Sequence, residues 1–181
     1  MINRSPDGKH PLIHNSSYIH PTAVIIGNVK IGKHVFVGPG AVIRADESKS
    51  SIFIEANCNV QDNVIIHSLS GCKVQIGKNT SLAHGCIVHG PCKIGKMCFI
   101  GFGSVVFDAV IEDKAVLKHL VVVENAHIPS KCTVDNRNKI DSSTNLSALK
   151  PSSSKTERFV TTVLKTNKSL LKGYKKPENN K

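Results

Sequence analysis

The sequence predicts an all-β solenoid, a parallel β-helix with three-sided coils, followed by one C-terminal α-helix. Aliphatic residues recur every six positions over most of the chain, as in Ile25, Ile31 and Val37. A small or β-branched side chain stands four places after most of them, and an amphipathic segment without this period follows. Neither a helix nor a hairpin meander gives a strict period of six. A β-helix does when three sides of six residues complete a coil of about 18 residues.

Composition limits the class of protein. The chain has 181 residues and 40% hydrophobic content, enough for one domain with a substantial core. Aromatic residues make up only 4%, so we expect an interior filled by small and β-branched side chains. No apolar run approaches the roughly 18 to 20 residues that span a bilayer. The segment MINRSPDGKHPLIHN also lacks the apolar centre of a secretory signal. We therefore expect a cytoplasmic protein with no membrane partner.

The net charge of +11 is concentrated at the C-terminal end. Residues 142–181 hold nine basic and two acidic residues, mostly lysines among Ser and Asn. Such a tail is more often a solvated surface than a nucleic-acid reader. We therefore expect no nucleic-acid partner.

The six-residue period defines the main domain. Residues 1–17 are expected to form an N-terminal arm and residues 18–140 the β-helix domain. The aliphatic positions expected to point inward are Ile19, Ile25, Ile31, Val37, Ile43, Ile54, Val60, Ile66, Ile76, Leu82, Val88, Ile94, Ile100 and Val106, and then, after a phase slip, Val110, Val116, Val122, Ile128, Val134 and Ile140.

Cysteines and glycines follow the same period. Five of the six cysteines occupy the small inward position, and Cys72 falls on the aliphatic phase. A free Cys behaves as a small buried hydrophobe, and positions on different sides of a coil would not converge on one ion. We therefore interpret the cysteines as packing residues. Glycines directly follow the aliphatic in pairs such as Ile31-Gly32 and Ile76-Gly77, where we expect a tight corner.

The period stops after Ile140. Residues 141–155 read as a Ser- and Pro-rich linker, residues 156–174 as a helix packed alongside the solenoid, and residues 175–181 as a basic tail. The helix is expected from an apolar stripe closed by a glycine: Phe159, Val160, Val163, Leu164, Leu170, Leu171 and Gly173. Asn167 falls on the apolar face. A polar group there usually has a partner, either a specific side chain or a neighbouring backbone group.

Several polar residues are spaced by one coil. Arg44 and Asp46 occur in VIRADE, and Gln61 with Asp62 follows 17 residues after Arg44. His67 and His84 are also 17 residues apart. A spacing of one coil stacks such residues on one side of the solenoid. A carboxylate beside an arginine is stably ionised and rigid, which suits a supporting role around a ligand set.

Three histidines with an open fourth position are the ligand set of a catalytic zinc site. His84 and His89 are five residues apart, whereas the helical metalloprotease pair needs a spacing of four. Along a strand an odd offset sends the two side chains to opposite faces. We therefore expect two chains at the site, one supplying His67 and His89 and its neighbour supplying His84, in a three-fold ring. The remaining histidines are interpreted as solvated: His10, His14, His20, His34, His119 and His127.

The runs IGKHVFVGPGAVI and IGKNTSLAHGCIVHG resemble the hexapeptide-repeat proteins, whose fold is a left-handed parallel β-helix. This fold hosts acyltransferases, metalloenzymes and inert subunits, so the likeness alone assigns no activity.

The order Arg-x-Asp, Gln-Asp, His and His-x4-His further resembles the gamma class of carbonic anhydrases. The resemblance implies zinc or ferrous iron, with cobalt as a substitute, on His67, His84 and His89 between subunits of a homotrimer. It also implies an intersubunit salt bridge from Arg44 to Asp46, with Asp62 completing the Gln-Asp pair. The roles implied for the remaining residues are water positioning by Gln61, proton handling by Glu47, and contact of Asn167, on the C-terminal helix, with the active-site region.

The leading hypothesis is therefore an enzyme, a carbonate dehydratase (lyase) that interconverts carbon dioxide and bicarbonate. One alternative is a hexapeptide-repeat acyltransferase that uses acetyl-coenzyme A and one histidine as general base. That activity usually needs an acceptor-binding loop, which the sequence does not show. A second alternative is a non-catalytic metal-binding or assembly subunit.

Overall fold

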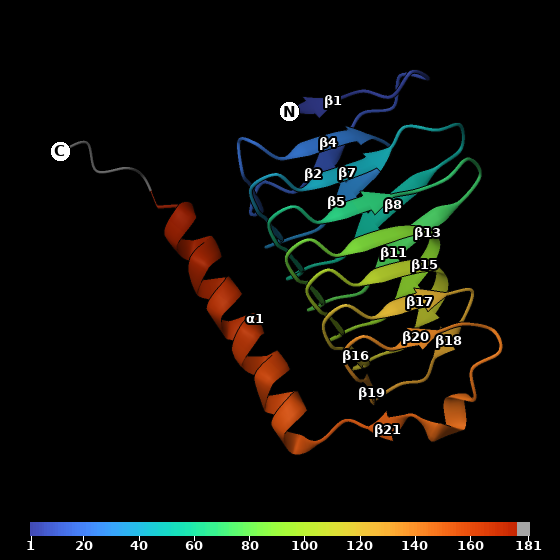
Figure 1. The fold of residues 1–181 in the computed structure, drawn as a ribbon. Helices are drawn as coiled ribbons and strands as arrows, with labels where there is room; N and C mark the ends of the chain where they lie inside the picture. Colours follow the sequence, from blue (N-terminus) through green and yellow to red (C-terminus); the bar gives the residue numbers. More distant parts are fainter. Residues whose placement is uncertain (177–181) are drawn as a thin grey trace.

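The computed structural model describes residues 1–176, which form a parallel β-solenoid of the left-handed hexapeptide-repeat type with one helix along its side (Figure 1). The predicted fold class is confirmed. The first side contains β1 (Ile2–Asn3), β4 (Val24–Gly27), β7 (Val42–Ala45), β10 (Ile65–His67), β13 (Ile87–Ile94), β15 (Val105–Ile111), β17 (Val122–Glu124) and β20 (Lys139–Ile140).

The second side contains β3 (Tyr18–Ile19), β6 (Phe36–Val37), β9 (Asn59–Val60), β12 (Ser81–Leu82), β14 (Phe99–Ile100), β16 (Val116–Leu117), β19 (Cys132–Val134) and β21 (Lys150–Pro151). The third contains β2 (Leu12–Ile13), β5 (Val29–Ile31), β8 (Ser51–Ile54), β11 (Lys73–Ile76) and β18 (His127–Ile128), together with the ends of β13 and β15, which turn the corner from the first side. Neighbouring coils pair in parallel, except that β21 is antiparallel to β19.

The core lies inside the coils and follows the predicted period as far as Val106. Ile25, Ile43, Ile66 and Leu82 are all fully buried. From Val110 to Val122 the predicted phase is wrong, because Ile111, Leu117 and Val123 point inward, and not Val110, Val116 and Val122. Both residues of each pair are aliphatic, so hydrophobicity did not distinguish the buried face of the strand from the outer one. Ile128, Val134 and Ile140 are again in the core, as predicted.

The glycines that follow the aliphatic residues allow the backbones of neighbouring coils to lie close together. A Cβ on Gly77 would lie 2.6 Å from the carbonyl carbon of Gly95, and one on Gly101 would lie 2.1 Å from the backbone oxygen of Lys118. The left-handed backbone occurs two residues later, at Asn79 (φ 58°) and at other non-glycine residues. The glycines therefore remove a side chain from a crowded contact, whereas their neighbours provide the turn.

Regular structure extends beyond the predicted β-helix domain at both ends. β1 and β2 lie within the segment expected as an N-terminal arm and pair with β4 and β5, so pairing extends into that segment. At the other end, the expected linker contains the 3-10 helix η1 (Leu146–Ala148) and β21, and Leu146 and Leu149 pack against the core. Covering the last coil protects strand edges that would otherwise be open to pairing.

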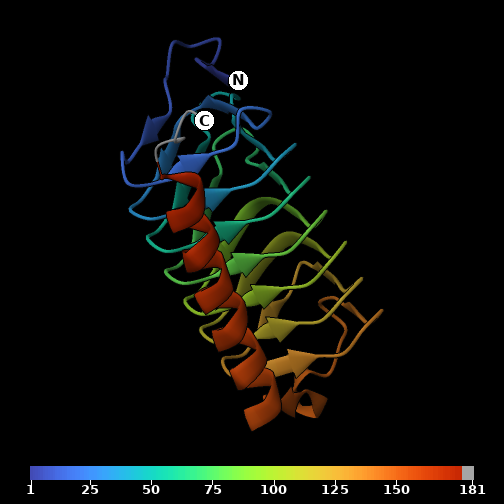
Figure 2. The ribbon, with the colours of Figure 1, turned by 90° about the vertical axis from the view of Figure 1, so that its left-hand side faces the viewer.

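The helix α1 (Ser154–Tyr174) begins two residues before the predicted start, because Ser153 caps it by accepting a hydrogen bond from the Thr156 backbone. It lies along the second side, from Phe159 against Phe99 to Tyr174 stacked on Tyr18 (Figure 2). Its buried residues are Val160, Leu164, Asn167 and Leu171. Of the expected basic tail, residues 177–181 lie outside the described residues. Within residues 1–176, no helix is both long and apolar enough to cross a membrane.

Candidate metal centre

A column of outward side chains on the first side contains two of the predicted metal ligands. Strand register places Arg44, His67, His89, Phe107 and Glu124 one above another, and we call this set the histidine column. The Nδ1 atom of His67 lies 3.1 Å from Nε2 of His89, with ring centroids 4.9 Å apart. Parallel pairing aligns successive coils, and the coil between these two residues is 22 residues long. The predicted stacking at a spacing of 17 is therefore wrong, because His67 lies on Arg44 and His89 and not on His84, and the register partner of Arg44 is His67 and not Gln61.

Two predicted supporting residues, Arg44 and Asp46, and the predicted proton-handling residue Glu47 lie around His67. Arg44 donates from Nε and Nη2 to Oδ2 of Asp46, both at 3.1 Å, within one chain. The Nε2 atom of His67 lies 3.4 Å from Oε1 of Glu47 and 3.7 Å from Oδ1 of Asp46. The other Glu47 oxygen accepts a hydrogen bond of 2.7 Å from the Ser70 backbone, which holds the carboxylate in place.

The electrostatics keep His67 neutral. Burial lowers the pKa of His67, and the neighbouring His89 and Arg44 lower it further, against a smaller opposite effect of Glu47 and Asp46. A neutral imidazole is the form that binds a metal ion.

Unpartnered atoms gather at the same place. Within the part of the chain that the structure describes, Nε2 of His67, Nδ1 of His89 and Oδ1 of Asp46 are buried without a hydrogen-bond partner. Buried polar atoms are normally satisfied, so such atoms indicate a missing partner. Of these atoms, Nε2 of His67 lies beside the carboxylates of Glu47 and Asp46, whereas the nitrogen of His89 that faces His67 is Nε2 and its Nδ1 is unpartnered. Imidazole nitrogen and carboxylate oxygen atoms are ligands that zinc and iron accept.

The third predicted ligand, His84, lies elsewhere on the chain. Its Nδ1 atom is 3.3 Å from Oδ2 of Asp62, and its ring is 5.5 Å from that of Phe102. A carboxylate on Nδ1 leaves Nε2 available and fixes the ring, as in the carboxylate–histidine pairs that support metal ions. Over residues 1–176, no three His, Cys, Asp or Glu side chains converge on one point. A single chain thus brings His67 and His89 together and leaves His84 apart.

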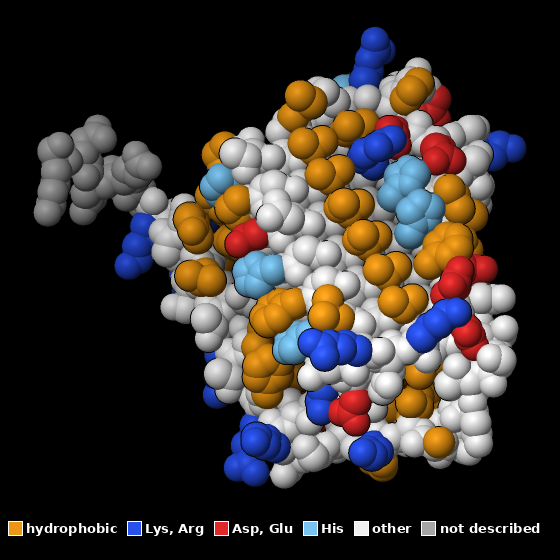
Figure 3. All heavy atoms as spheres, viewed as in Figure 1, with side chains coloured by type: hydrophobic (Ala, Val, Ile, Leu, Met, Phe, Trp, Pro, Cys, Tyr) orange, Lys and Arg blue, Asp and Glu red, His pale blue; other side chains and the backbone are white. Residues whose placement is uncertain are grey.

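Between the histidines runs a row of hydrophobic side chains that are partly exposed. Figure 3 shows this row with histidines on both sides of it. We call it the aliphatic row, and register defines its members as Val24, Val42, Ile65, Ile87, Val105 and Val122. Ile65 at its centre is 40% exposed. A continuous apolar strip on a β-sheet face is typical of a protein interface.

The remaining predicted residues form a polar network under α1. The side-chain nitrogen of Gln61 donates to Oδ1 of Asn167 at 3.0 Å and to Oδ1 of Asn59 at 2.7 Å. Asn167 therefore has a specific side-chain partner. Asn59 is not among the predicted site residues, because a single Asn on a strand carries no signal of its burial.

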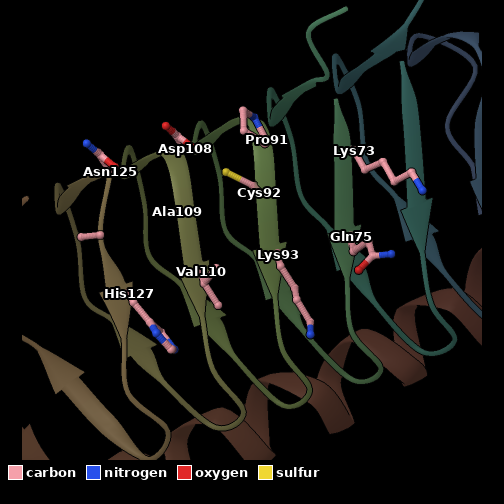
Figure 4. A pocket seen from close by; sticks show the side chains of 11 residues that line it. Lys73, Gln75, Pro91, Cys92, Lys93, Asp108, Ala109, Val110, Asn125 and His127 are labelled. Atoms are coloured by element: carbon pink, nitrogen blue, oxygen red, sulfur yellow. The ribbon is translucent and has the colours of Figure 1, made fainter. Parts of the chain in front are cut away.

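Two cavities differ in their relation to these residues. One of about 430 Å³ lies between α1 and the second side, and Gln61, His84 and Asn167 line it. Another of about 520 Å³ lies over the third side (Figure 4). Its polar side chains, among them Lys73, Asp108 and His127, stand apart along separate strands, and it contains none of the predicted site residues.

Comparison with known proteins identifies the repeat. The family described as bacterial transferase hexapeptide (six repeats) matches residues 10–45 and 73–108. The carboxysome assembly protein CcmM of a Nostoc species is 36% identical over 145 residues, which cover 71% of this chain and 26% of CcmM. The carnitine operon protein CaiE of Escherichia coli is 34% identical over 119 residues, which cover 65% of this chain and 59% of CaiE. The chain thus spans less than two thirds of either relative.

The solved structure of a hexapeptide transferase family protein from Anaplasma phagocytophilum superposes with a TM-score of 0.81. The match covers 96% of this chain and 98% of that one at 24% sequence identity. At that identity the likeness concerns the fold alone.

Proposed function

We propose that this chain, a hexapeptide-repeat protein in which His67 lies beside His89 and His84 lies apart against Asp62, is a gamma-type carbonic anhydrase. It catalyses the reversible hydration of carbon dioxide to bicarbonate at a zinc or ferrous ion between subunits of a homotrimer. The observation that carries the proposal is the contact of His67 with His89, each with an unpartnered nitrogen atom, beside Glu47.

The trimer follows from the placement of the ligands. His67 and His89 belong to the histidine column, whereas His84 lies at a corner of the coil against Asp62. A head-to-tail contact along the aliphatic row brings His67 and His89 of one chain next to the partner subunit's His84. Such contacts close into a ring when the rotation permits, and a three-sided prism favours three copies.

His67, His89 and the partner subunit's His84 would hold the ion, and the ion would act as a Lewis acid that lowers the pKa of a water molecule. Hydroxide, the species that attacks carbon dioxide, would then be present near neutral pH. Asp62 holds the His84 ring through Nδ1. Glu47, half-exposed and 3.4 Å from His67, receives the released proton and passes it to solvent.

Gln61 orients the reacting hydroxyl group. Both hydrogens of its side-chain nitrogen are used by Asn59 and Asn167, so only its oxygen remains as an acceptor. That oxygen accepts a hydrogen bond from the attacking water or from the hydroxyl of bicarbonate. Asn167 thus acts as a positioning residue through Gln61.

Two other functions have some support. The 36% identity to a carboxysome assembly protein favours a non-catalytic metal-binding or assembly subunit. The transferase description of the matched repeat favours an acyltransferase that uses acetyl-coenzyme A. An acyltransferase needs one histidine as general base and does not account for two adjacent imidazoles that each keep one buried nitrogen atom without a partner.

The deciding experiment is stopped-flow hydration of carbon dioxide by protein purified without oxygen and reloaded with zinc or with ferrous iron. We expect activity that requires metal, is lost in His89→Ala and is kept in His127→Ala, a matched control in which an exposed histidine paired with Glu112 is replaced. If the protein binds zinc and ferrous iron and neither loaded form hydrates carbon dioxide, the proposed enzymatic function is overturned and the assembly subunit is favoured. Coenzyme A binding that survives His89→Ala would favour the acyltransferase.

A further inference from the structure

The 430 Å³ cavity under α1 has an apolar wall. The rings of Phe99, Phe102 and Phe159 line it together with Val163 and Leu170. Phe159 on α1 meets Phe99 edge to face, with ring centroids 5.1 Å apart. Among residues 1–176, no Lys, Arg, Asp or Glu lines this cavity, and His84 is the histidine that does.

Three uncharged donors face the same cavity. The hydroxyl of Ser81 is buried, with the residue only 1% exposed, and it has no hydrogen-bond partner. The side-chain oxygens of Asn59 and Asn167 are both used by Gln61. The opposite end of each amide is an NH2 group, and among residues 1–176 neither NH2 group donates a hydrogen bond within the chain.

The cavity is larger than carbon dioxide needs, and its lining offers more polar and apolar contacts than carbon dioxide needs. Cavities of roughly 300 to 1,000 Å³ with apolar walls and a few convergent polar groups hold small organic ligands. A buried hydroxyl without a partner is unfavourable, and a hydrogen-bond acceptor on a ligand would remove that cost. Hydrogen-bond donors without a positive charge suit a neutral carbonyl oxygen better than a carboxylate.

We propose that this cavity binds a small organic molecule with an uncharged carbonyl group, such as an amide or ester, and a short apolar chain. Its oxygen accepts hydrogen bonds from Ser81, Asn59 and Asn167, and its chain lies against Phe99, Phe102 and Phe159. The ligand would lie beside Gln61 and His84. The inference goes beyond the hydration of carbon dioxide and does not depend on it.

The test is NMR titration of the full-length, metal-loaded protein with hexanamide, compared with hexanoate and 1-hexanol. We expect saturable shifts in α1 and β12 with hexanamide and weaker binding of both other probes. Ser81→Ala removes one hydrogen bond and is expected to weaken hexanamide binding about fivefold. Thr166→Phe fills the cavity from an exposed position on α1 and is expected to weaken binding at least about tenfold.

Lys168→Phe is the matched control, because Lys168 is exposed on the same helix and does not line the cavity. It should leave binding unchanged. No saturable binding of hexanamide, or equal loss in Lys168→Phe, would overturn the proposal. Tighter binding of hexanoate than of hexanamide would refute the proposal that the ligand's polar group is uncharged. Equal binding of 1-hexanol and hexanamide would refute recognition of a carbonyl group. Hydration of carbon dioxide is measured separately, so hexanamide binding to a protein without that activity would sink only the proposed enzyme.

Discussion

The side-chain nitrogen of Gln61, on the solenoid, donates a hydrogen bond of 3.0 Å to Oδ1 of Asn167, on the C-terminal helix. The two residues are 106 positions apart in sequence. Asn167 is buried between Leu164 and Leu171 on the face of α1 that packs against the coils. The helix therefore does more than cover the second side, because it fixes the side chain that faces the proposed reaction.

We predict that Asn167→Ala lowers kcat/KM for carbon dioxide hydration about fivefold to tenfold, because Gln61 loses one of its two restraints. A buried hydrogen bond contributes about 1 kcal/mol, so a similar loss in the free energy of unfolding is expected. Metal content should be unchanged, since Asn167 contacts no predicted ligand. Stopped-flow assay and metal analysis of the same samples check this, with Lys168→Ala as control. A fall in metal content would show that the residue only maintains the fold.

Asp62→Asn should weaken zinc binding about 10- to 100-fold, because the carboxylate 3.3 Å from Nδ1 of His84 no longer orients and polarises the imidazole. Competition with a chelator measures the zinc affinity. Asp113→Asn is the control, since Asp113 also caps a coil corner, by accepting from the Lys96 backbone, and has no histidine partner. Equal losses in both variants would contradict a specific role for Asp62.

Ile65→Glu should dissociate the proposed trimer. Ile65 is at the centre of the aliphatic row and is 40% exposed in the single chain, so a carboxylate there would be buried between subunits without a partner. Sedimentation analysis should find monomers, and zinc should be lost with the interface. Val110→Glu is the control, because Val110 is 38% exposed on the third side, away from the row. A trimeric Ile65→Glu protein would rule out this face as the interface.

The parts of this structure that could be predicted are those with a period. The six-residue period predicted most of the buried positions, and the apolar stripe of the helix predicted α1 to within two residues. The 17-residue spacing did not predict the contact of His67 with His89, because the coil between them has 22 residues. The choice of Ile111 over Val110 was not predictable, since both residues are aliphatic. Asn59 and Ser81 were missed because they acquire a role only when α1 covers them, a contact between segments far apart in sequence.

The cysteines should divide into two groups by reactivity. Cys58, Cys86, Cys92 and Cys98 are buried, whereas Cys72 and Cys132 are partly accessible. Burial raises the pKa of Cys58, Cys86 and Cys98 to about 12, so their thiols remain protonated and unreactive near neutral pH. Alkylation of native protein with iodoacetamide at pH 8, followed by mass spectrometry, should label only Cys72 and Cys132. Labelling of the other four should require urea, and their rapid labelling without it would contradict the packed core.

The same thiols should make the protein sensitive to alkali. The pKa of Cys86 rises from 9.0 to about 12 on folding, so the folded state holds a proton that the unfolded state releases above pH 9. The contribution of this thiol to the free energy of unfolding is therefore fully present below pH 9 and is lost as the pH rises toward about 12. Well above pH 9, each such thiol should lower that free energy by about 1.4 kcal/mol per pH unit.

Urea unfolding at several pH values between 8 and about 10.5 measures the slope. Cys86→Ala, although less stable at pH 8 because of the smaller side chain, should show a shallower slope than the unsubstituted protein, and parallel slopes would show that the Cys86 proton is not linked to folding.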